Sequence, residues 1–161
     1  MGSLSIPVRL TLADLSATAL AEAAAALATA DDPNTFLTAL ENNHHLWRLL
    51  LEVAQSEQWA TPDQRLADFV LAVSRKCGTG VCDDDIEALI GINRDLASRL
   101  IEGRDPARIR QRAELAWREA ESRHARPLLA WLADEMARKT RCHRRPPPPR
   151  PISPGHETVL R

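Results

Sequence analysis

The order of apolar and polar residues along the chain favours a protein built from helices. Apolar residues return at alternating steps of four and three from Phe36 onward, and a second seam of this kind begins at Ile86. Such steps place side chains on one face of an α-helix, whereas a half-buried strand requires strict alternation. The pattern therefore predicts an all-α fold, a small helical bundle of four to six helices.

Capping residues suggest where these helices begin. Thr11 and Asp14 have the spacing of a capping box. Thr61-Pro62 and Asp105-Pro106 each place a capping side chain before a proline in the first helical position, where the missing N–H costs nothing. We expect helices over roughly residues 12–30, 35–54, 62–77, 83–102, 106–126 and 127–140.

Charge and proline content divide the chain into three predicted parts. Residues 1–103 form a helical domain, residues 104–140 form a charged helical extension, and residues 141–161 form a tail rich in proline and arginine. The net charge is −1, but the stretch from Arg138 onward carries seven basic residues against Glu157. Four consecutive prolines cannot enter a helix interior, so we expect this tail to be disordered.

Two asparagines interrupt the apolar seams. Asn43 lies in line with Leu40 and Trp47, and Asn93 holds the equivalent place in the seam that begins at Ile86. A buried amide without a partner costs about 1–3 kcal/mol, so each must form hydrogen bonds. One interpretation is that they fix helix register or cap a loop carbonyl. The other is that they face one another, or a partner peptide, across a shared groove.

The histidines and cysteines do not form a recognisable metal site. His44 and His45 point about 100° apart on a helix, and neither has a second ligand four residues away. Cys77 and Cys82 have a possible zinc spacing, but the second pair would be residues 142–143 beside the tail. We therefore expect no cofactor, and the odd number of cysteines indicates a reducing compartment.

Other classes of function find little support in the sequence. The chain has no phosphate-binding glycine loop and no glycine-flanked nucleophile, so we do not expect an enzyme. Direct RNA binding would have to use the basic tail, because acids offset the arginines elsewhere and no aromatic residues are interleaved with them. The alanine-rich stretch 17–30 resembles a signal peptide, but Glu22 interrupts it and only Arg9 precedes it, so we expect a cytoplasmic protein.

Three segments of the sequence resemble the FlaF flagellar regulator family. They are ALENNHHLWRLL, VSRK and LIGINRDLASRLIEG, and together they cover roughly residues 35–103. The resemblance does not extend to residues 104–161, and the alanine-rich stretch replaces the family's usual N-terminal segment. The matching positions are Ala39, Leu40, Asn43, Leu46, Trp47, Val73, Arg75, Leu89, Ile90, Ile92, Asn93, Arg94, Glu102 and Gly103.

The resemblance implies a regulator of flagellum biogenesis that promotes flagellin synthesis and secretion by binding flagellin, alongside FlbT. An amphipathic flagellin helix would suit a helix-in-groove mode of binding. The expected partner-binding residues are Asn43, Trp47, Asn93 and Arg94, although Trp47 is equally in phase to be a core residue. The alternative is a generic helical interaction or dimerisation module that uses the charged extension, and less readily an RNA-binding regulator.

Overall fold

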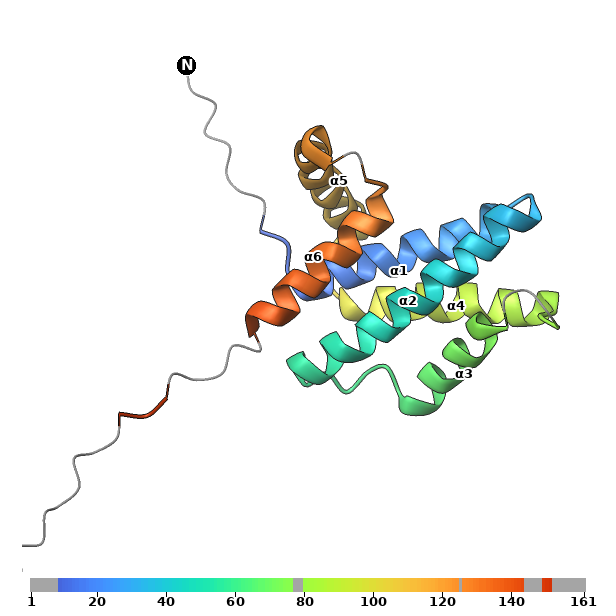
Figure 1. Cartoon of the computed structure of the whole chain (residues 1–161), viewed down its shortest axis with the longest axis horizontal. Helices are drawn as coiled ribbons and strands as arrows, with labels where there is room; N and C mark the ends of the chain where they lie inside the picture. Colours follow the sequence, from blue (N-terminus) through green and yellow to red (C-terminus); the bar gives the residue numbers. More distant parts are fainter. Residues whose placement is uncertain (1–8, 77–79, 125, 144–148, 152–161) are drawn as a thin grey trace, which may run out of the picture.

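A computed structural model describes residues 9–76, 80–124, 126–143 and 149–151. Over these residues the chain forms six α-helices and no strand, which confirms the predicted all-α fold (Figure 1). The helices are α1 (Leu12–Thr29), α2 (Pro33–Glu57), α3 (Gln64–Arg75), α4 (Asp83–Leu100), α5 (Pro106–His124) and α6 (Leu128–His143).

The capping box predicted at the first helix is present. The Asp14 backbone N–H donates to Thr11 Oγ1, and the Thr11 backbone N–H donates to Asp14 Oδ2, both at 3.1 Å. The start expected at Asp105-Pro106 is also found, because the Asp105 carboxylate accepts from the Ala107 N–H at 3.0 Å. These side chains satisfy N–H groups that the first turn of a helix leaves free.

Two predicted helix starts are wrong. Helix α2 begins at Pro33, two residues early, because Asp32 caps it through the Thr35 N–H at 2.9 Å. Helix α3 begins at Gln64, two residues late, because Asp63 is extended and supplies the cap in place of Thr61.

The predicted end of the last helix is also wrong. Helix α6 continues to His143, so residues 141–143 are helical and do not belong to the tail. His143 Nδ1 lies 2.5 Å from the Glu57 carboxylate at the end of α2, which holds this last turn in place. Of the predicted disordered tail, residues 144–148 and 152–161 lie outside the described part of the chain.

Helix α1 is the central element of the bundle. It packs against α4, α6, α2 and α5, and in Figure 1 α2 crosses in front of α1 and α4. Small apolar side chains cover nearly every face of this helix, as expected of a helix that is surrounded by others. It is also the one helix among the described residues long and apolar enough to span a membrane, but 61% of it is buried inside the protein, and a core helix passes the same test.

The predicted extension contributes to the same hydrophobic core. Helix α6 packs on α1 and α2, while α5 packs on α1 and α6. Ile109 and Ala113 of α5 and Leu132 and Met136 of α6 are buried within the core cluster that α1 to α4 also form. The boundary predicted at Gly103 thus falls between helices that share one core.

Candidate functional site

Four buried polar side chains from three helices form a continuous hydrogen-bond network. Trp47 Nε1 of α2 donates to Asn93 Oδ1 of α4 at 2.8 Å. Asn93 Nδ2 donates to Asn43 Oδ1 of α2 at 2.7 Å, and Asn43 Nδ2 donates to Ser74 Oγ of α3 at 3.3 Å. We call these four residues the buried amide network.

The network is enclosed by the hydrophobic core. Asn43, Trp47 and Asn93 are 0% exposed and Ser74 is 3% exposed. Because water cannot reach them, each donor or acceptor that lost its partner would stay unsatisfied. The bonds therefore hold α2, α3 and α4 in one relative register, since sliding any of these helices would break at least one bond.

The structure brings Asn43 and Asn93 together, as one of the two interpretations predicted, but in the protein interior and not across an open groove. Three of the four residues expected to bind a partner, namely Asn43, Trp47 and Asn93, reach no surface in this conformation. Arg94, next to Asn93 on α4, is exposed. Of the four residues expected to bind a partner, only Arg94 can be reached from the surface in this conformation.

Sequence reasoning missed Ser74. It lies on the buried side of α3, four residues after Val70 and adjacent to Val73. That spacing was a usable signal, because positions three and four apart share one face of a helix. Ser74 also falls between Val73 and Arg75, so each of the three segments ALENNHHLWRLL, VSRK and LIGINRDLASRLIEG contributes to the network.

Arg94 borders an apolar cleft between α1, α4 and α5. Within the described residues Arg94 has no hydrogen bond or ion pair, whereas Arg110 across the cleft is paired with Glu22 and Glu114. The cleft has a volume of about 400 Å³. Its other lining residues are small or apolar over most of their surface: Ala17, Thr18, Ala21, Ala97, Ser98, Ile101, Pro106, Ala107 and Ile109.

His44 and His45 of α2 line a second cleft of about 400 Å³ between α2 and α3, to which Ser74 of the network also contributes. Burial lowers the pKa of His44, and the charges of His45, Arg48 and Arg75 lower it further. The His44 Nδ1 atom is buried and has no hydrogen-bond partner among the described residues. His44 is therefore held in its neutral form over a wider pH range than an ordinary histidine.

The described residues contain no group of three or more His, Cys, Asp or Glu side chains that could hold a metal ion. Cys82 and Cys142 are exposed and unpaired, while Cys77 lies outside the described residues.

Comparison with known proteins gives no relative for this chain. No family model matches it, and no curated protein and no solved structure matches it either.

Proposed function

We propose that this protein binds an amphipathic helix of flagellin in the cytoplasm and thereby promotes flagellin synthesis and secretion, in functional interplay with FlbT. The role is non-catalytic. It rests on the resemblance of residues 35–103 to the FlaF family and on the arrangement of the segments that carry this resemblance.

The observation that carries the proposal is the buried amide network. The resembling segments are separated along the chain, yet all three meet in one set of hydrogen bonds. Asn43, Trp47 and Asn93, which belong to the resembling pattern, form one structural unit with Ser74, and this arrangement supports the proposal. A fixed arrangement of helices also favours binding, because a preformed groove loses less entropy when a partner docks.

The binding surface in this proposal is the apolar cleft beside Arg94. A partner helix can place apolar side chains among the alanines and Ile109 of the cleft. An acidic residue on the same helix can pair with Arg94, which has no partner among the described residues. In this scheme Asn43, Trp47 and Asn93 act indirectly, because they hold α4 in position.

Co-purification is the first test. Tagged protein recovered from flagellated cells should carry flagellin, and deletion of its gene should reduce the amount of secreted flagellin and shorten or abolish filaments. If the tagged protein brings down no flagellin and the deletion leaves filaments intact, the proposal fails.

A charge reversal then locates the surface. Arg94→Glu should weaken binding of purified flagellin about tenfold or more, because a like charge at the contact replaces an attractive one. Arg112→Glu, on exposed α5 away from the cleft, is the matched control and should bind normally. Equal affinity for both variants would place the partner elsewhere. Dimerisation without any flagellin binding, measured by light scattering, would favour the generic interaction module.

A further inference from the structure

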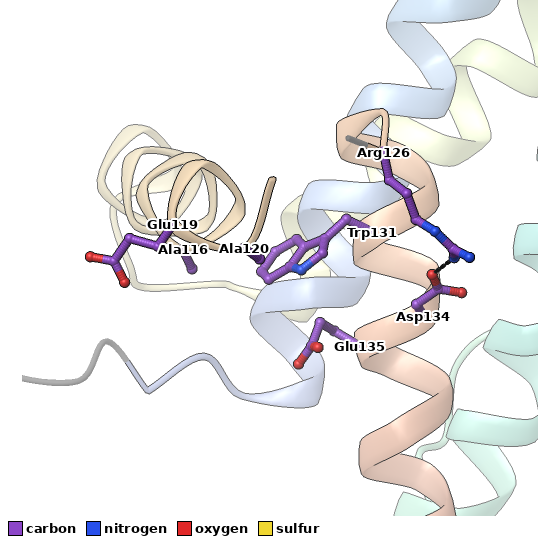
Figure 2. A pocket seen from close by; sticks show the side chains of 7 residues that line it. All are labelled: Ala116, Glu119, Ala120, Arg126, Trp131, Asp134 and Glu135. Carbon is purple, nitrogen blue, oxygen red and sulfur yellow. Dashed lines mark hydrogen bonds and ion pairs between the residues drawn. The ribbon is translucent and has the colours of Figure 1, made fainter. Parts of the chain in front are cut away.

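A different cleft, between α5 and α6, has the Trp131 ring and the Glu135 carboxylate on the same side of α6 (Figure 2). It has a volume of about 620 Å³. In Figure 2 the Trp131 ring extends from α6 toward Ala120 of α5, and the Glu135 side chain lies on the same side of α6. The lining residues are Ala116, Glu119, Ala120, Arg126, Trp131, Asp134 and Glu135. We call this the α5–α6 cleft.

The chemistry of the α5–α6 cleft suits a basic, proline-rich ligand. Proline rings in an extended polyproline helix dock against exposed aromatic rings, and that backbone is already ordered before binding. Arginine side chains bind carboxylates through two parallel hydrogen bonds. Asp134 pairs with Arg126 and Glu135 pairs with Arg138; the side chains of Arg126, Asp134 and Arg138 are more than half exposed, and that of Glu135 is 25% exposed. An incoming arginine can join or replace such exposed partners at little cost.

We propose that the α5–α6 cleft binds the chain's own segment 146–151, Pro-Pro-Pro-Pro-Arg-Pro. Pro151 would lie against Trp131, and Arg150, one residue before it, would bind the carboxylate of Glu135, which is nearer to His143 along α6. The segment matches the cleft in both respects, since it combines a proline run with a cation between prolines. This inference does not depend on the proposed flagellin binding.

The segment is long enough to reach the α5–α6 cleft. Twelve residues of α6 separate Trp131 from His143, which corresponds to about 18 Å along the helix. Six residues of extended chain, from residue 145 to Pro151, can span about 19 Å, so a chain that turns back after His143 is long enough to bring Pro151 to Trp131. Residues 149–151 are exposed and lie apart from α5 and α6 in Figure 1, so the proposed bound form would be a second state of the protein. Attachment to the same chain gives the segment an effective concentration of about millimolar.

Fluorescence quenching in the full-length chain tests this proposal. The three cysteines are changed to serine, and a bimane dye, which tryptophan quenches on contact, is attached at Ser153→Cys. If about two thirds of the molecules hold the bound form, the dye should be about threefold brighter in the Trp131→Phe variant than in its parent. Trp59→Phe is the matched control. Trp59 follows the end of α2, close to the contact between Glu57 and His143, so it is near the start of the tail but outside the α5–α6 cleft. Circular dichroism confirms that both variants fold.

Further outcomes decide the occupant. Arg150→Glu should release the quenching, whereas Arg161→Glu, which lies outside the proposed segment, should not. Salt at about 1 M should also release it, since it screens exposed ion pairs. Equal brightness of the parent and the Trp131→Phe variant would overturn the proposal, as would relief by Trp59→Phe alone. Quenching that grows with protein concentration would also overturn it, because the occupant would then be the tail of a second copy.

Discussion

Two tryptophans in this protein satisfy their indole N–H groups with different kinds of acceptor, one buried and one exposed. Trp47 donates to the side chain of Asn93 in the interior, where water cannot replace the acceptor. Trp117 of α5 donates to the backbone carbonyl of Arg126 at 2.7 Å, in an exposed connection between α5 and α6. The first bond depends on one particular side chain far away in the sequence, whereas the second needs only a nearby carbonyl.

The same contrast separates the two regions around these residues. In α2, α3 and α4 the decisive polar groups are few, uncharged and buried, so they specify how the helices pack. In α5 and α6 the polar groups are numerous and charged, and they pair at the surface, as Arg126 does with Asp134. Exposed pairs have water as an alternative partner and contribute little to stability. Substitutions of these polar side chains should therefore lower the free energy of unfolding strongly in α2, α3 and α4 and only slightly in α5 and α6.

The largest effect is expected for Asn93→Leu. It removes the acceptor of Trp47 and the donor to Asn43, so the free energy of unfolding should fall by about 3 kcal/mol despite the added apolar surface. Urea denaturation measures this loss. The adjacent surface change Arg94→Gln should stay within about 0.5 kcal/mol of the parent. An Asn93→Leu protein as stable as the parent would remove the distinction between the two regions.

Coupling between the asparagines should be the next largest effect. Asn43→Leu combined with Asn93→Leu should cost less than the sum of the single changes by about 1–2 kcal/mol, because the second substitution removes a group that the first left unpaired. A double-mutant cycle from denaturation curves gives this energy. Strict additivity would show that the 2.7 Å contact between the two amides contributes nothing specific.

An intermediate effect is expected where the two regions join. The carboxylate of Asp14, part of the α1 capping box, also lies 2.6 Å from Arg104 at the start of the α5 side. Thr11→Ala removes the cap and should cost about 1 kcal/mol in thermal or urea unfolding. Thr29→Ala is the control, because its hydroxyl only bonds an exposed backbone carbonyl within α1. Equal losses for both would mean that the cap is unimportant.

A smaller effect should appear in the pH dependence of stability. The pKa of His44 is lowered in the folded protein, chiefly by burial, from its ordinary value of 6.5. The unfolded chain therefore binds a proton first as the pH falls, so stability should decline below 6.5 and level off below the folded pKa. His44→Gln should flatten this part of the urea-midpoint profile. The exposed neighbour His45→Gln should retain the decline, and an unchanged His44→Gln profile would contradict the assignment.

The smallest effect belongs to the exposed pair. Arg126→Gln should change the free energy of unfolding by no more than about 0.5 kcal/mol, because both Arg126 and Asp134 are more than half exposed. Urea denaturation beside the Asn93→Leu protein measures the difference. A loss as large as that of Asn93→Leu would mean that the α5–α6 region also depends on specific polar contacts.

Local rules in the sequence predicted much of this fold. Steps of three and four placed Asn43, Trp47 and Asn93 on buried helix faces, and they are buried. The capping box at Thr11 and the helix start at Pro106 follow from chemistry confined to a few residues. Such rules succeed because each is decided within one turn of helix.

What the sequence left open depends on competing or distant groups. Thr61 was predicted to cap α3, but Asp63, which has an equally good capping side chain two residues later, supplies the cap. The extra turn of α6 is held by Glu57, a residue 86 positions away. Ser74 was missed because a serine on a helix is usually solvated, and only packing against Asn43 gives it a buried partner. The sequence pattern also did not predict that α1 is the central helix, although most of its residues are apolar.

The 2.7 Å bond between Asn43 and Asn93 has an evolutionary consequence. A single substitution at either position leaves the other amide without its partner and gives a less stable protein. A matched pair of substitutions avoids this loss. The two positions, fifty residues apart, should therefore change together or not at all as the sequence diverges. Arg94, one residue further along α4, is exposed and, among the described residues, has no bond to the core, so it can change without regard to either asparagine.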